Sequence, residues 1–242
     1  MRKLMVILLF IFCKVIPLYG QPSGTDTAFH QSAVNTAISF YTGSQGEHVR
    51  LYTGSEYTGY RYPLLKDHPF FKTDSATKGS VFYDGMVYND VSMWYDVVSD
   101  LIIVLNKFGN VKIVLESSRV KYFSLSDHHF VRVDSVSSIP AGFYDQLYSG
   151  TTTLLVRRSK SATQVIDEMT AKTAVQWNND QYYVLKDGSV HRFRKPSAIK
   201  KILHDKHRGI QQFMKTNKLS FRRSREGSMV KILAYYDNVT RK

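Results

Sequence analysis

The sequence predicts an α+β protein, with an antiparallel β-meander sheet, an N-terminal helix and a C-terminal helical segment. Between Gly79 and Arg158, runs of roughly 5 to 9 residues rich in β-branched and aromatic side chains alternate with Gly, Asn, Asp and Ser. The connections between these runs are too short for helical crossovers, which indicates antiparallel neighbours. After Pro196, apolar residues recur at helical spacing instead.

The first predicted element is a short amphipathic helix from about Phe29 to Tyr41, where apolar residues recur at helical spacing. Glycines follow it and end it. The stretch from Arg50 to Tyr62 is rich in tyrosine and is followed by the aromatic segment His68–Phe71. We expect these aromatic residues to cover an edge of the sheet.

The strands of the meander come next, with Lys107–Asn110 as the tight turn of a hairpin. One further hairpin joins Tyr182–Leu185 to Val190–Phe193, and Ser159–Ser161 between the two groups is predicted to be a polar loop. The predicted meander strands are Ser80–Tyr83, Met86–Tyr95, Asp100–Leu105, Val111–Glu116, Val120–Leu125, Phe130–Val133, Gly142–Tyr148 and Thr152–Arg158.

Three short helices are predicted after Pro196 and Ser197, which are favourable opening residues. The second ends at Asn217 and the third ends before Asp237. Each has an apolar stripe that is expected to pack against the preceding sheet. The stripes are Ile199, Ile202 and Leu203; Ile210, Phe213 and Met214; and Met229, Ile232, Leu233 and Tyr236.

Residues 1–20 have the features of a secretory signal peptide. A positive start at Arg2 and Lys3 precedes the apolar run Leu4–Cys13, and Pro17 breaks the segment. Ten apolar residues are too few for a permanent membrane helix, which needs about 20. We therefore expect an exported protein, periplasmic or extracellular, with no transmembrane segment after leader removal. The single cysteine, Cys13, lies in the leader, so the mature chain has no disulfide.

The charge of the chain is concentrated in its last third. Residues 21–150 carry 10 basic and 13 acidic residues, whereas residues 151–242 carry 20 basic and 7 acidic ones, a net charge of +13. Together with the pattern of elements, this divides the mature chain into a helix plus antiparallel β domain (21–160) and a β-hairpin with a basic helical part (161–242), packed on the same sheet. Export argues against nucleic acid as the partner, so the expected partner is an anionic envelope component or another envelope protein.

The chain resembles a group of uncharacterised exported proteins from the Bacteroidota. The resemblance covers nearly the whole mature chain and is carried by the segments Leu51–Tyr57, His68–Phe71, Gly79–Tyr88, Trp94–Asp96, Gly142–Tyr144 and Tyr235–Asp237. These are aromatic and glycine packing patterns. The resemblance therefore implies a bacterial, extracytoplasmic location and transfers no activity and no site residue.

Two sets of residues are candidates for binding. Exposed tyrosines bind sugar rings or polypeptide through flat contacts, and the candidate aromatic surface is Tyr52, Tyr57 and Tyr60; the alternative is that these rings pack on the sheet. Guanidinium and ammonium groups recognise phosphate and carboxylate. The candidate anion-binding or partner-binding residues are Lys215, Lys218, Arg222, Arg223 and Arg225, for which the alternative is a solvated basic surface.

No catalytic signature is present in the sequence: it lacks a glycine-flanked serine elbow and the paired histidines of a metalloprotease. His204 and His207 are three apart on a predicted helix, a spacing that suits zinc, but the neighbouring basic residues repel a divalent ion. We therefore predict no catalytic residue, no cofactor and no metal ligand.

Three functions remain open. The favoured one is a non-enzymatic envelope or periplasmic protein that binds another cell-surface component. The alternatives are a lipid or lipoprotein carrier, in which a half-barrel encloses an apolar cavity, and a cell-wall or glycan hydrolase with polar residues converging in a cleft.

Overall fold

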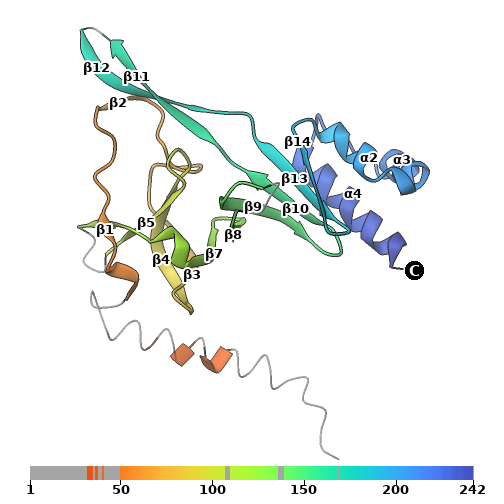
Figure 1. The fold of residues 1–242 in the computed structure, drawn as a ribbon, viewed down its shortest axis with the longest axis horizontal. Coiled ribbons are helices and arrows are strands. Elements are labelled where there is room, and N and C mark those ends of the chain that lie inside the picture. The colour runs from red at the N-terminus through yellow and green to blue at the C-terminus, as the bar shows by residue number, and fades with distance from the viewer. Residues whose placement is uncertain are drawn as a thin grey trace, which may run out of the picture.

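The computed structural model describes residues 50–106, 110–135, 139–167 and 169–241, together with residues 32–34, 36, 37 and 40. The predicted signal peptide lies outside these residues, and the helix predicted from about Phe29 to Tyr41 lies largely outside them. The rest is mostly antiparallel sheet followed by a helical C-terminal segment, which confirms these two parts of the predicted fold class (Figure 1).

The main sheet has eleven strands, and every neighbouring pair in it is antiparallel. Across the sheet the strands are β1 (Ser55–Glu56), β6 (Lys112–Val114), β5 (Leu101–Leu105), β4 (Met86–Asp96), β3 (Thr77–Tyr83), β7 (Val120–Leu125), β8 (His128–Val133), β9 (Gly142–Ser149), β10 (Thr153–Arg157), β13 (Gln181–Lys186) and β14 (Ser189–Phe193).

The strand order departs from a simple meander where β1 lies beside β6, where β7 lies beside β3, and where β10 lies beside β13. After β6, a short link containing the 3₁₀ helix η3 (Ser117–Arg119) returns the chain so that β7 pairs with β3 instead of β6. The two meanders, β3 to β6 and β7 to β10, thus share the β3–β7 pairing. Sequence periodicity identifies each strand but not its partner. Once β4 has paired with one edge of β3, the other edge is equally available to any later strand.

A long hairpin between β10 and β13 was not predicted. It consists of β11 (Lys160–Asp167) and β12 (Thr170–Trp177), and β2 (Leu64–Lys66) adds a parallel third strand. The hairpin leaves the main sheet and extends away from it (Figure 1). The prediction of a polar loop at Ser159–Ser161 is therefore wrong, since β11 begins at Lys160. The segment lacks the apolar alternation of a half-buried strand, so its strand character comes from its pairing with β12.

The C-terminal segment contains η4 (Pro196–Ala198), α2 (Ile199–Ile202), η5 (His204–Lys206), α3 (His207–Thr216) and α4 (Arg225–Thr240). No helix among the described residues has the length and apolar character needed to cross a lipid bilayer. The helices cover one face of β10 and β13, as the predicted stripes require. The buried residues of this cluster are Leu154, Val156, Tyr182, Val184, Phe193, Ile199, Leu203, Ile210, Met229, Ile232, Leu233 and Tyr236.

The predicted end of the last helix before Asp237 is wrong, because α4 continues to Thr240 and encloses this residue. The Asp237 carboxylate is buried and accepts hydrogen bonds from the Tyr148 hydroxyl (3.0 Å), the Thr152 hydroxyl (2.9 Å) and the Thr152 amide (3.0 Å). A buried carboxylate is tolerated when such donors satisfy it. Asp237 thus attaches the helix to the β9–β10 turn.

The second large cluster is the core formed by strands β3 to β9 in chain order, and it is rich in aromatic rings. Phe123 and Phe130 stack with centroids 4.7 Å apart, and Tyr95 and Phe143 contact this pair at 5.0 to 5.3 Å. These distances are those of well-packed aromatic pairs. The interior of this part of the sheet is filled by its own side chains.

Candidate functional site

The strands β10, β13 and β14 present two different faces, because alternate side chains of a strand point in opposite directions. Val156 and Tyr182 face the C-terminal helices and are buried. Their neighbours Arg157, Gln181 and Tyr183 therefore lie on the other face of the sheet. An open groove of about 700 Å³ lies on this second face.

Three arginines line the groove, and the strand register explains why they meet. Arg157 is paired with Gln181, and Tyr183 is paired with Arg192 on the next strand. Arg194 lies just beyond the end of β14 and lines the same groove, and its Nε donates to Gln181 Oε1 at 3.3 Å. The remaining lining residues are Pro140, Ser159, Gln176, Trp177, Asn178 and Asn179.

The first of these arginines is fixed in place. Arg157 donates from Nη2 to Asp100 Oδ2 (3.1 Å) and from Nη1 to the Ala141 carbonyl (2.7 Å). Gly142, at φ 144°, allows this approach, since a Cβ there would lie 2.1 Å from Arg157 Nη1. The charge of Arg157 is therefore partly neutralised.

The other two arginines differ from Arg157. Neither Arg192 nor Arg194 forms an ion pair with a described residue, and both are exposed. No Asp or Glu is among the described residues that line the groove. The groove therefore offers uncompensated positive charge to an anionic ligand.

One wall of the groove is the end of β12, where Trp177 is 45% exposed. The Lys160 ammonium lies over the indole, 4.5 Å from its centroid, and the Phe71 ring contacts Trp177 in an edge arrangement at 6.2 Å. Lys160 is itself buried, and its Nζ donates to the carbonyl of Phe70 at 2.9 Å. Burial disfavours the charged ammonium and lowers the pKa of Lys160.

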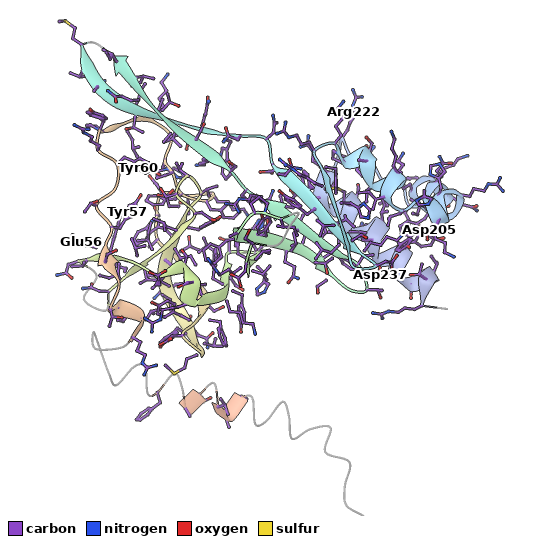
Figure 2. All side chains as sticks on the ribbon, viewed as in Figure 1. Glu56, Tyr57, Tyr60, Asp205, Arg222 and Asp237 are labelled. Carbon is purple, nitrogen blue, oxygen red and sulfur yellow. The ribbon has the colours of Figure 1, made fainter. Side chains whose placement is uncertain are left out.

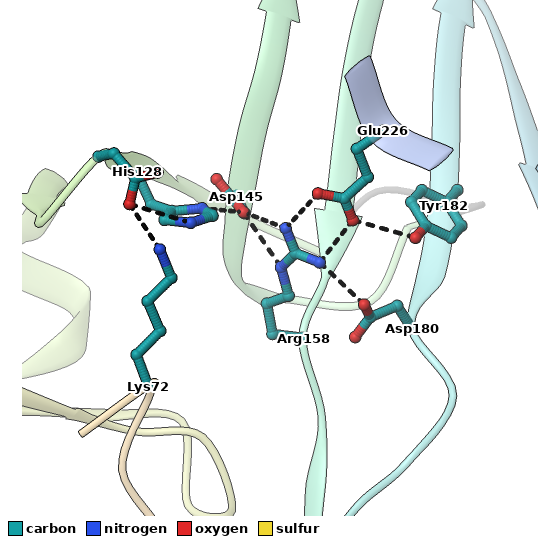
Figure 3. A network of polar contacts seen from close by, with 8 residues as sticks. Lys72, His128, Asp145, Arg158, Asp180, Tyr182 and Glu226 are labelled. Carbon is teal, nitrogen blue, oxygen red and sulfur yellow. Dashed lines mark hydrogen bonds and ion pairs between the residues drawn. The ribbon is translucent and has the colours of Figure 1, made fainter. Parts of the chain in front are cut away.

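Beneath the groove, a buried arginine connects separate parts of the chain (Figure 3). Arg158 is 8% exposed, and it donates from Nε to Asp145 Oδ2 (3.1 Å) and from Nη1 to Asp180 Oδ2 (2.8 Å). Its Nη1 and Nη2 also donate to the two carboxylate oxygens of Glu226, at 2.7 and 3.0 Å. His128 Nδ1 lies 2.6 Å from the same Asp145 oxygen. The guanidinium thus joins β9, the link between β12 and β13, and the first turn of α4.

This network determines the position of the groove wall. Arg158 lies where the chain leaves the main sheet for the β11–β12 hairpin, and Asp180 lies where the chain returns. Their ion pair holds together the two ends of the hairpin, next to Trp177. Burial raises the pKa of Asp180, and the neighbouring Arg158 opposes this shift.

Several tyrosines are expected to make the protein sensitive to alkaline pH. Burial, reinforced by the Asp96 carboxylate, raises the pKa of Tyr57 and Tyr60 above the ordinary value of 10.0. Burial, reinforced by the Glu226 carboxylate, raises the pKa of Tyr182 to about 12. The folded state thus keeps these hydroxyls protonated. Their contribution to stability is full below pH 10 and is lost as the pH rises through the folded-state pKa values.

We therefore expect the free energy of unfolding to fall above pH 10, with phenolate absorbance rising together with the loss of circular dichroism. In urea, where the chain is unfolded, the same tyrosines should titrate near their ordinary pKa. A folded protein whose tyrosines all titrate near pH 10 would contradict this expectation.

The predicted aromatic surface is partly occupied by internal contacts. Tyr52, Tyr57 and Tyr60 are all half-buried, and Tyr52 packs against the core formed by strands β3 to β9. The hydroxyls of Tyr57 and Tyr60 donate to the fully buried carboxylate of Asp96, at 2.9 and 3.0 Å. Their polar groups are thus engaged in holding the N-terminal segment on the sheet (Figure 2).

The predicted basic residues lie at the helical end of the molecule, in and around the turn between α3 and α4, where Figure 2 shows Arg222. All five are exposed. Lys215 belongs to α3, Arg225 begins α4, and the turn carries the others, which are Lys218, Arg222 and Arg223. We call this set the basic turn. None of its residues is among those that line the groove.

The histidines are distributed over separate contacts. His204 and His207 are exposed, and His207 Nε2 lies 2.8 Å from Gln211 Nε2. The adjacent residues His128 and His129 contact Asp145 and Ser124 respectively, as expected for side chains on opposite faces of a strand. Within the described ranges, no three His, Cys, Asp or Glu side chains are grouped so that they could hold a metal ion.

The residues that line the groove were not predicted from the sequence. Arg192 in β14 and Arg194 just after this strand are two residues apart, the spacing of side chains on one face of a strand, and this signal was present in the sequence. The contribution of Trp177 could not be found in the same way, because it depends on the missed hairpin.

Comparison with known proteins gives no assignment: no family model matches the chain, and no match is found among curated proteins or solved structures.

Proposed function

We propose that the protein is an exported, non-enzymatic binding protein that holds an anionic ligand of the cell envelope in the groove. The observation that carries this proposal is the pair Arg192 and Arg194, which line an open groove without an acidic partner among the described residues. A guanidinium that already has a carboxylate, such as Arg157, gains less from a ligand anion than one that has none. The predicted signal peptide and the resemblance to exported proteins of the Bacteroidota support the location.

The basic turn is the competing site for the same kind of ligand, and the chain allows a matched comparison. Arg192→Gln with Arg194→Gln removes two charges from the groove, and Lys218→Gln with Arg222→Gln removes two from the basic turn. Both variants lower the net charge equally. We expect the groove variant to bind at least tenfold more weakly than wild type, because a hydrogen bond to a charged group contributes about 1.5–3 kcal/mol. The basic-turn variant should bind within about threefold of wild type, since none of its residues lines the groove.

The measurement is binding of the purified protein to lipopolysaccharide, to phosphatidylglycerol vesicles and to polygalacturonate, each at low and high salt. Affinity should fall steeply as salt rises. Absence of salt-dependent binding to all three probes would count against the proposed function. Equal losses in the two variants would place the contact outside the groove.

The two alternatives, a lipid or lipoprotein carrier and a glycan hydrolase, stay predictions, and no feature of the described residues favours either of them.

A further inference from the structure

The groove contains groups that are free to contact a ligand and groups that are already engaged. Arg157, Asn178 and Gln181 make hydrogen bonds with other side chains and form part of the framework. The partner of Gln181 is Arg194 Nε, whereas the two terminal nitrogens of Arg194 make no hydrogen bond with a described residue. Gln176 and Asn179 are exposed, and their side chains make no hydrogen bond with a described residue. Together with Trp177, Arg192 and Arg194, they determine which ligand chemistry fits.

Trp177 provides a preformed apolar surface. Lys160 lies over its ring and Phe71 contacts it, so the indole is held while nearly half of its side chain stays exposed. A rigid aromatic group binds a flat or ring-shaped ligand with little loss of conformational entropy. A ligand that consists only of phosphate groups makes no use of this surface.

The free amides indicate a ligand with hydroxyl groups. The side chains of Gln176 and Asn179 each carry two N–H donors and a carbonyl acceptor, and a hydroxyl both donates and accepts. A polyphosphate offers acceptors only. The amides therefore complement a polyhydroxylated ligand, while Arg192 and Arg194 complement its negative charge.

A sugar with an acidic group combines these features: an apolar ring face, hydroxyls and a carboxylate. A single-stranded nucleic acid also has rings and negative charge, but proteins that bind it stack successive bases on several aromatic side chains. Among the described residues that line the groove, one aromatic ring is exposed, that of Trp177, because Tyr183 is only 2% exposed. The observations favour the sugar.

We propose that the ligand of the groove is an acidic glycan, with one sugar ring packed on Trp177 and its carboxylates bound by Arg192 and Arg194. This inference rests on the proposed function and names the ligand class of the same site. The amides of Gln176 and Asn179 bind the sugar hydroxyls.

The test is a fluorescence titration of the purified protein. The chain has two tryptophans, and Trp94 is 7% exposed, so a change in emission on ligand addition reports on Trp177. The probes are an oligogalacturonide, its neutral methyl ester, polyphosphate and a single-stranded oligodeoxynucleotide. The ester is the matched control, because it keeps the rings and removes the charge.

The oligogalacturonide should change the tryptophan emission and bind at least tenfold more tightly than its ester and than polyphosphate. Trp177→Ala should weaken its binding by about tenfold, the loss seen when a ring that stacks on a ligand is removed. Because Trp177 also covers Lys160, a second variant is needed whose effect is not structural. Arg192→Gln should reduce the preference for the acid over the ester, while binding of the ester stays unchanged.

The other outcomes overturn the inference in distinguishable ways. Polyphosphate binding that equals oligogalacturonide binding and survives Trp177→Ala would leave an anion site but eliminate the glycan. Tighter binding of the oligodeoxynucleotide would assign the groove to nucleic acid. If no probe binds at low salt, the proposed function fails as well.

Discussion

Replacement of Arg158 by methionine is expected to lower the free energy of unfolding by about 3–5 kcal/mol. The guanidinium is 8% exposed and Asp145 is 1% exposed, so the carboxylate cannot gain water when its partner is removed. One oxygen of Asp145 has no hydrogen-bond partner among the described residues, and the other would keep only His128 Nδ1, at 2.6 Å. Chemical denaturation followed by circular dichroism measures the change.

Two further variants separate the contributions to this effect. Adding Asp145→Asn to the Arg158→Met variant should restore part of the stability, because it removes a buried charge that has lost its guanidinium partner. Glu226→Gln should cost less than Arg158→Met, since Glu226 is 28% exposed and lies at the rim of the network. A loss of less than about 1 kcal/mol on Arg158→Met would mean that the network is solvated and does not hold the hairpin base.

Replacement of Ile113 by aspartate is expected to unfold the protein. Ile113 lies in β6, where it is paired with Val104 of β5. Its side chain is 9% exposed and belongs to the core formed by strands β3 to β9. Burying a carboxylate in this apolar cluster costs several kcal/mol, which is comparable with the total stability of about 5–15 kcal/mol that a domain has. Circular dichroism and thermal melting measure the outcome.

The matched control keeps the apolar character of the site. Ile113→Val removes one methylene and should cost only about 0.5–1.5 kcal/mol, with a cooperative transition. An aspartate variant that melts like wild type would show that β6 does not belong to the packed core.

The strands could be predicted where the chain is half-buried and bounded by turn residues. Val120–Leu125 has the same limits in the prediction and in the structure, and the limits of Met86–Tyr95 differ by one residue. The pairing of β7 with β3 could not be predicted, because any strand with a buried face can occupy a free edge. The β11–β12 hairpin was missed because its stability comes from pairing and from Lys160, whose ammonium is buried against backbone carbonyls.

The candidate site was less accessible to prediction than the fold. The residues of the basic turn are close together in sequence and could therefore be predicted as a set, whose binding role stays a prediction. The groove instead combines residues from separate strands, among them β10, β12 and β14. Arg157 and Arg158 illustrate the difficulty: as neighbours in sequence they look equivalent, yet one lines the groove and the other is enclosed by three carboxylates.

By itself, the sequence determined the antiparallel sheet, the helical C-terminal segment and the accumulation of positive charge in the last third of the chain. These properties follow from local periodicity and composition, which need no knowledge of distant neighbours. Only the tertiary structure decided which charges are neutralised and which remain free, because the energy of a charge depends on its burial and on partners brought close by strand pairing. Arg192 and Arg194 are available to a ligand for that reason, and Arg158 is not.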